Sequence, residues 1–272
     1  MKETSKLIKY LAIALALFLA FSIVSGIMYG ITFIGNMITD NPDSVNVNEK
    51  FEEITFDENI TGLDINVKSV NLIIKDGEQL KAETNNKEMN YKIDNGKLYI
   101  VEDKHNWFSK NNDSDLILYL PSGTSFNNIK IESGAGKFKV DSLNTDTLEL
   151  DLGAGKVDIN NLNVVNKVEI DGGAGEIIIK DGNINNLDLD MGVGRVELNT
   201  LLTGSNEIDA GIGELVLNLV GTNDDYKLHL NKGIGEILVD GNSMSNDSVY
   251  GNGINTVNVD GGIGKIDINF IN

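Results

Sequence analysis

Residues 187–198 read LDLDMGVGRVEL, and this stretch decides the fold. Apolar residues alternate with charged ones on both sides of the step Gly192-Val193-Gly194. Alternation with a period of two residues is typical of a β-strand with one buried face and one face in water. Glycine adopts backbone conformations that other residues avoid, so the step permits a sharp bend. The stretch therefore predicts two short strands joined at a glycine corner.

The same pattern recurs along the second half of the chain. Its copies are GAGKFKV at 134, GAGKVDI at 153, GAGEIII at 173, GVGRVEL at 192, GIGELVL at 211, GIGEILV at 233 and GIGKIDI at 262. Successive copies begin 19, 20, 19, 19, 22 and 29 residues apart. A unit this short cannot bury its own apolar face, whereas stacked units form one continuous core, with each coil pairing in parallel with the next coil in the sequence.

We therefore predict an all-β fold, a parallel β-solenoid (β-helix) with coils of 19–20 residues, over residues 132–272. Residues 51–131 are rich in strand-like segments but lack the glycine step. We interpret them as irregular N-terminal coils and a cap, because an uncapped terminal coil would leave a free sheet edge. The alternative is an antiparallel meander folded into a sandwich.

The first fifty residues differ in composition from the rest. Residues 1–9 carry three lysines, and residues 10–34 are uncharged and almost wholly apolar. A helix of that length spans about 37 Å, enough for a bilayer core of about 30 Å. We predict a cytoplasmic tail (1–9), one transmembrane helix (10–34) and a linker (35–50). Lysines before the helix and acids after it predict a single-pass protein of the cell membrane with an extracytoplasmic C-terminal domain. The alternative is a signal peptide cleaved near Ala20-Phe21-Ser22.

Residues 116–136, LILYLPSGTSFNNIKIESGAG, carry a family resemblance. A strand ending in Leu-Pro, a short turn, a second strand and a small-residue glycine step resemble the bacterial "putative adhesin" β-strand-repeat family, which includes LiaG-like membrane-anchored proteins. The resemblance covers about residues 51–272. It implies a β-solenoid on the cell surface, often linked by genomic context to envelope-stress sensing, and specifies hardly any activity. The glycine steps of this chain are unusually uniform, which predicts more regular coils.

Charge and composition narrow the classes of function. The formal net charge of −19 opposes binding to nucleic acids, and to anionic surfaces unless a cation bridges them. The chain has no cysteine, and only His105 and His229 could act as bases near neutral pH. No serine lies in a G-x-S-x-G elbow. We therefore predict a protein that is not an enzyme and needs no cofactor other than, at most, Ca²⁺.

The acidic residues before the glycines form the most distinctive chemical pattern. If the coils stack in register, these outward residues form two neighbouring ladders with like charges about 5 Å apart. Such crowding raises carboxylate pKa values unless cations or hydrogen-bond donors compensate. One hypothesis is a cation-binding face for Ca²⁺, which prefers oxygen ligands. The alternative is a solvated face that keeps the protein soluble. The residues of this predicted metal face are Glu149, Asp151, Glu169, Asp171, Asp188, Asp190, Glu207 and Asp209.

Two apolar features suggest a surface for a partner. After the glycines, the second outward position holds Ile178, Val216 and Leu238, which could form a partner-binding strip or lie beneath a local loop. Trp107 and Phe108 stand in a polar insertion and could form a binding tip, since aromatic residues are favoured anchors. The alternative is that they fold back over one end of the solenoid.

These observations favour a non-catalytic, membrane-anchored, extracytoplasmic protein with an adhesin-like or other interaction role, in envelope-stress signalling among other contexts. Its partner would be an envelope component or another protein. The alternatives are a structural module stabilised by Ca²⁺ and an enzyme that acts on wall polymers.

Overall fold

A computed structural model describes residues 51–57, 59–103 and 114–271. The chain divides into two compact units, residues 1–45 and 46–272, and the fold below concerns the second. The cytoplasmic tail, transmembrane helix and linker predicted for residues 1–50 lie outside the described residues. Within the described residues, no helix is long and apolar enough to cross a membrane.

The described residues form one sheet of 17 strands. The strands are β1 (Glu52–Thr55), β2 (Gly62–Val67), β3 (Val70–Gly77), β4 (Lys81–Thr84), β5 (Met89–Asp94), β6 (Lys97–Glu102), β7 (Ser114–Pro121), β8 (Ser125–Ile179), β9 (Gly182–Asn185), β10 (Leu187–Thr203), β11 (Ser205–Val220), β12 (Tyr226–Asn231), β13 (Ile234–Val239), β14 (Asn242–Ser243), β15 (Ser248–Gly251), β16 (Asn255–Asp260) and β17 (Ile263–Ile271).

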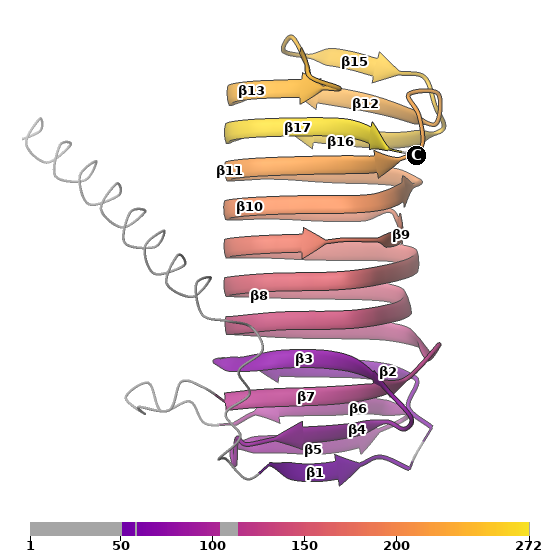
Figure 1. The fold of residues 1–272 in the computed structure, drawn as a ribbon, viewed down its shortest axis with the longest axis vertical. Coiled ribbons are helices and arrows are strands. Elements are labelled where there is room, and N and C mark those ends of the chain that lie inside the picture. The colour runs from indigo at the N-terminus through magenta and orange to yellow at the C-terminus, as the bar shows by residue number, and fades with distance from the viewer. Residues whose placement is uncertain (1–50, 58, 104–113, 272) are drawn as a thin grey trace, which may run out of the picture. The chain divides into compact units, whose positions relative to one another are not determined.

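Each coil bends at its glycine step and contributes strands to two facing layers (Figure 1). In β10, Leu189 and Met191 before the step are buried, as are Val196 and Leu198 after it. The side chains between them point to water, as the period of two requires. The long strand β8 runs through several such bends, and its coils follow one another along the stack.

Neighbouring coils pair in parallel and in register. Asp190 of β10 lies opposite Asp209 of β11, and Gly194 lies opposite Gly213. The same strand pairs in parallel with β8 on its other side. The predicted all-β, mostly parallel fold is therefore confirmed, and an antiparallel meander is excluded for these coils.

The order of the last two coils differs from the sequence order, and the prediction of sequential stacking is wrong there. Strand β16 pairs with both β11 and β12, and β17 pairs with both β11 and β13. The last coil is thus inserted between the two coils that precede it in sequence (Figure 1). The spacings of 22 and 29 residues provide the extra chain. Part of it forms β14 and β15, from which the chain returns to fill the space.

The first coil is inserted in a similar way. Strand β2 lies between β6 and β8, and β3 lies between β7 and β8. This coil has no glycine step, and a buried carboxylate holds its bend. Glu102, only 3% exposed, accepts hydrogen bonds from the backbone N–H groups of Lys68 at 2.6 Å and Ser69 at 3.1 Å.

Antiparallel strands close both ends of the stack. At one end β4 pairs with β7, β1 pairs with β4, and β5 pairs with β6. At the other end β15 pairs with β12, and the two-residue strand β14 pairs with β13. Short terminal strands limit the length of free sheet edge that could pair with another chain.

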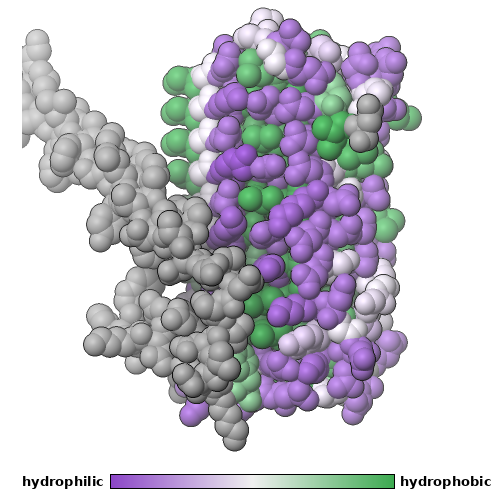
Figure 2. Space-filling view, viewed as in Figure 1, coloured by the Kyte–Doolittle hydropathy of each residue, from purple (hydrophilic) through white to green (hydrophobic). Residues whose placement is uncertain are grey.

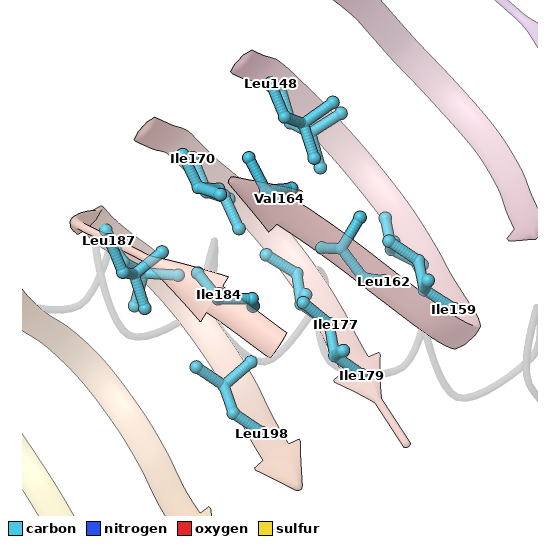
Figure 3. Close-up of a cluster of buried hydrophobic side chains, with 14 of the residues drawn as sticks. Leu148, Ile159, Leu162, Val164, Ile170, Ile177, Ile179, Ile184, Leu187 and Leu198 are labelled. Carbon is cyan, nitrogen blue, oxygen red and sulfur yellow. The ribbon is translucent and has the colours of Figure 1, made fainter. Parts of the chain in front are cut away.

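The core is a continuous column of aliphatic side chains between the two layers (Figure 3). In its middle, Leu148 and Ile170 of β8 and Leu187 of β10 come from one layer, and Ile177 and Leu198 come from the other. Burial of such side chains is the main favourable term in folding. Because the column is continuous, each coil stabilises the next.

Candidate functional site

In the coils that contain a glycine step, the bend is a place where only glycine fits. A Cβ atom at Gly211 would lie 2.0 Å from the carbonyl oxygen of Met191. A Cβ atom at Gly213 would lie 1.8 Å from the carbonyl oxygen of Gly194, and the φ of Gly213 is +141°. Both distances are far below van der Waals contact, and the positive φ is strained for any other residue. The middle residue of the step is therefore the one side chain that the bend can carry.

In the upper coils of Figure 1 that middle residue is large and apolar. Val193 lies opposite Ile212, Ile212 opposite Ile263, and Ile263 opposite Ile234. Ile212 is 38% exposed, Ile263 49% and Ile234 72%. We call Val193, Ile212, Ile263 and Ile234 the apolar ridge. Figure 2 shows it as a projecting column of hydrophobic side chains along the bend, beside the paler glycines.

The apolar ridge was not predicted from the sequence. The glycine steps were interpreted as a sign of regular coils, and the residue between the glycines was given no role. That residue is alanine in the first three steps, at 135, 154 and 174, and valine or isoleucine in the later four. The sequence does contain a signal for the ridge. Along the repeats, the residue between the two glycines changes from alanine to valine or isoleucine, at a position predicted to lie on a bend.

The predicted acidic ladders lie on the layer before the bend. The inner ladder, two residues before each glycine step, contains Asp151, Asp171, Asp190 and Asp209, and the outer ladder, four residues before each step, contains Glu149, Glu169, Asp188 and Glu207. Asp190 is flanked by Asp171 and Asp209, and Asp188 by Glu169 and Glu207. The inner ladder continues to Asp260, which lies between Asp209 and Asn231 because the last coil is inserted there. Asn231 donates a hydrogen bond of 2.6 Å to Asp260.

The inner ladder carries unrelieved repulsion at its centre. Desolvation, and then the charges of Asp190 and Asp151, raise the pKa of Asp171 above the ordinary aspartate value. Desolvation and the charge of Asp209 raise the pKa of Asp190 in the same direction. The outer ladder is relieved, because Lys167 lies 2.9 Å from Glu169 and 3.6 Å from the Asp188 carboxylate.

The ladders do not converge on a metal position. Among the described residues, no group of three or more His, Cys, Asp or Glu side chains could hold a metal ion. In-register stacking separates successive carboxylates by about 4.8 Å along a line, whereas Ca²⁺ needs six to eight oxygens around one point. Ca²⁺ binding by the predicted face from Glu149 to Asp209 stays a prediction.

The layer after the bend has mixed charge. Arg195 is 2.7 Å from Glu197 and 3.0 Å from Glu214, and Lys156 is 2.8 Å from Glu176. These ion pairs join adjacent coils or adjacent outward positions. The ridge therefore separates an acidic flank from a flank that contains both signs of charge.

The predicted apolar strip is not continuous. Glu197 lies between Ile178 and Val216, and Asp267 lies between Val216 and Leu238. The three apolar side chains thus alternate with carboxylates along the stack. Glu197 and the inserted last coil separate the three side chains along the stack, and partner binding by them stays a prediction. Trp107 and Phe108, the predicted binding tip, lie outside the described residues.

A partly open hollow of about 30 Å³ lies along the bends and is lined in part by Leu152, Ile177 and Met191.

Comparison with solved structures gives three similar proteins. A protein of Clostridium sporogenes described as a "putative cell adhesion protein" is 20% identical, with a TM-score of 0.39, over 82% of this chain and 99% of the other. A "putative adhesin" of Bacteroides fragilis is 14% identical, with a TM-score of 0.40, over 80% and 97%. One of Parabacteroides distasonis is 15% identical, with a TM-score of 0.34, over 82% and 98%. Similarity at these levels does not extend to function.

A comparison with curated proteins finds no match. The profile of the Toastrack DUF4097 family matches residues 60–252, which include six of the seven glycine steps and the 116–136 stretch. The resemblance predicted from that stretch is confirmed, and the chain belongs to the Toastrack DUF4097 family.

Proposed function

We propose that the protein is a non-catalytic surface module, anchored in the cell membrane by residues 10–34, that presents a rigid stack of coils to the envelope. Its partners are envelope components or other proteins, and envelope-stress signalling is the context that its family resemblance implies. The extracytoplasmic placement rests on the charge asymmetry around the apolar segment.

The apolar ridge is the observation that carries this proposal. Large apolar side chains are held in water along one line by a backbone that admits no neighbouring side chains. Exposed apolar patches on a protein surface often mark sites of interaction with a partner.

A combined binding and turnover assay on the full chain tests the proposal. External protease added to intact cells should degrade the module, which checks that it faces outward. Purified full-length protein in phosphatidylcholine vesicles is then mixed with isolated cell-wall polymer, and both co-sedimentation and released fragments are measured. We expect the module to be accessible and no fragments to be released. Fragment release would establish the wall-polymer enzyme, and full protection in intact cells would contradict the surface location.

The second candidate, a structural module stabilised by cations, is supported by the raised pKa values at Asp171 and Asp190. Its test is thermal unfolding with EDTA and then with millimolar Ca²⁺ or Mg²⁺, at fixed ionic strength. A rise of several degrees specific to Ca²⁺ that disappears in the double variant Asp171→Asn, Asp190→Asn would support it. An unchanged midpoint would leave the acids as a solvated face.

A further inference from the structure

Two Asn-Gly pairs occur in the sequence, Asn95-Gly96 and Asn252-Gly253. In such a pair the backbone nitrogen of the glycine can attack the side-chain carbonyl carbon of the asparagine, because glycine has no Cβ atom to hinder the approach. The structure holds the two glycine nitrogens in different ways. We propose that Asn95 is a site of spontaneous deamidation in the folded protein, and that the fold protects Asn252 from the same reaction.

The first pair forms the tip of the hairpin between β5 and β6, at one end of the stack (Figure 1). Asp94 pairs with Lys97, so Asn95 and Gly96 alone make the loop. Their φ values are +52° and +75°, as in the type I′ turn that Asn-Gly favours. The Asn95 side chain is exposed. Within the described part of the chain, the Gly96 N–H donates no hydrogen bond. The reacting nitrogen is therefore free.

The second pair follows β15, where the chain turns back toward β16. The Asn252 side chain is exposed, as that of Asn95 is, so the difference lies in the glycine. The Gly253 N–H donates a hydrogen bond of 2.9 Å to the carbonyl oxygen of Tyr226. A Cβ atom at Gly253 would lie 2.0 Å from the carbonyl carbon of Asp225, so the backbone there is closely packed. The hydrogen bond opposes loss of the amide proton, and the packing opposes movement of the nitrogen toward the side chain.

The reaction needs no reagent other than water. The Gly96 nitrogen gives up its proton to the solvent and forms a bond to Cγ of Asn95. The side-chain nitrogen takes up a proton and leaves as ammonia, which gives a cyclic succinimide. Water then opens the ring at one of its two carbonyl carbons. One product is aspartate, and the other is isoaspartate, in which the backbone runs through the side-chain methylene carbon.

The carbonyl group of Gly96 connects this turn to the first coil. Its oxygen accepts hydrogen bonds from the N–H groups of Thr61 at 2.7 Å and Gly62 at 3.3 Å, where β2 begins. Isoaspartate lengthens the turn by one backbone carbon atom and so displaces this carbonyl group. Both products add a negative charge at the tip of the hairpin, and the isoaspartate form also loosens the start of the first coil. The module thus carries a covalent change that accumulates with its age.

Peptide mapping of the aged full-length protein by mass spectrometry tests the proposal. The chain is incubated in detergent micelles at mildly alkaline pH, both folded and in guanidinium chloride, and the conversion of each asparagine is followed over time. In the folded protein we expect Asn95 to react at least about tenfold faster than Asn252, because Gly253 must first open locally. In guanidinium chloride, which removes the fold, the two rates should agree within about twofold.

The matched variant is Asn95→Gln, because a glutamine side chain would have to close a larger ring and reacts far more slowly. Hydrogen exchange of the Thr61 and Gly62 amides is measured in fresh and aged chains. In the isoaspartate fraction of the natural chain, we expect their protection to fall by about tenfold. Protection should not change as Asn95→Gln ages. Asn95→Asp, which adds the charge without the extra backbone atom, should keep the protection of the fresh natural chain.

Three outcomes overturn the proposal. The first is a reaction at Asn252 that is as fast as that at Asn95, or faster, in the folded protein. The second is a rate difference that persists in guanidinium chloride, since it would then come from neighbouring residues and not from the fold. The third is unchanged protection of Thr61 and Gly62 in chains that contain isoaspartate at position 95, which would remove the connection to the first coil.

Discussion

At the scale of single residues, the shape of the surface follows from how closely the coils approach at their bends. Gly194 has a φ of +143°, and a Cβ atom there would lie 1.8 Å from the carbonyl oxygen of Gly175. The stack therefore excludes side chains from two positions of each bend and pushes the third outward. The apolar ridge is a consequence of this packing and of the isoleucines that occupy the free position.

Substitution of Gly194 should be far more costly than substitution of its neighbour. Gly194→Ala introduces both a backbone clash and an unfavourable φ, and we expect a loss of roughly 2–5 kcal/mol in the free energy of unfolding. Val193→Ala removes a half-exposed side chain and should cost less than about 1 kcal/mol. Urea unfolding of both variants measures the difference. Equal losses would contradict the close approach of the coils.

Neutral side chains in the inner acidic ladder should make the fold more stable, by an amount that depends on pH. Desolvation and then the neighbouring carboxylates raise the pKa values of Asp171 and Asp190 in the folded state. The resulting destabilisation is therefore present above the folded pKa and vanishes below the unfolded value of about 3.9. Asp171→Asn with Asp190→Asn should raise the melting temperature by about 1–4 °C at pH 7. The gain should shrink toward zero as the pH falls to about 3.5. A gain that is constant over this range would contradict the assigned cause.

Substitution of Glu102 should lower the stability of the fold, in contrast to the substitutions in the inner acidic ladder. Its buried carboxylate satisfies the N–H groups of Lys68 and Ser69 at a bend without glycines. Glu102→Gln removes the charge assistance and should cost about 1–3 kcal/mol. Glu88→Gln, on an exposed residue near the same end, is the control, and chemical denaturation compares the two. Equal stabilities would contradict the role of Glu102.

At the scale of elements, the last coil holds two other coils together. Strands β16 and β17 pair on one side with β11 and on the other with β12 and β13. Each inserted strand thus makes two ladders of hydrogen bonds, whereas the end coil makes one parallel ladder and one antiparallel contact. The C-terminal end of the chain lies inside the stack and not at its tip.

Deletion of residues 253–272 should therefore affect more than the deleted coil. Strands β12 and β13 lose their parallel partner and their share of the core, including contacts to Ile266 and Ile268. We expect amide protons of residues 226–239 to lose most of their protection from exchange, while those of residues 187–198 keep theirs. Retained protection at 226–239 would show that β12 and β13 stack without the last coil.

The sequence predicts the elements better than it predicts their order. Alternation around Gly192 and Gly194 identifies two strands and a bend, because the buried and exposed faces leave a period-two pattern. The 22- and 29-residue spacings reveal insertions but do not indicate where the chain returns, since any coil with the same pattern fits any neighbour. The first coil escaped detection as an inserted element because its bend depends on Glu102, 34 residues from Lys68, and not on a local glycine motif.

The sequence also predicts only part of the candidate site, because register along the repeat is visible in the sequence and the order of the last coils is not. The acidic ladders follow from register alone, so the sequence predicts that Asp171, Asp190 and Asp209 are neighbours. The position of Glu197 between Ile178 and Val216 follows from the repeat alone, whereas the position of Asp267 between Val216 and Leu238 depends on the order of the coils. The ridge could have been found, because its residues stand at a fixed place in every copy of the repeat.

At the scale of the whole module, stack order decides which side chains are neighbours. The end of the inner ladder and the second interruption of the strip depend on the last coil lying between β11 and the pair β12–β13, whereas the apolar ridge contains the same four side chains in either order. If the coils stacked in sequence order, Ile234 would lie beside Ile212, and Val216 beside Leu238.

One measurement tests this order directly and uses the absence of natural cysteines. The double variants Val216→Cys with Asp267→Cys and Val216→Cys with Leu238→Cys are oxidised, and intramolecular disulfides are mapped by mass spectrometry of peptides. Val216 and Asp267 are direct partners on adjacent strands, within disulfide range, whereas Val216 and Leu238 are two rungs apart, about 9.6 Å. We predict a disulfide in the first variant and none in the second. A disulfide between positions 216 and 238, with none between 216 and 267, would contradict the inserted coil and every contact derived from it.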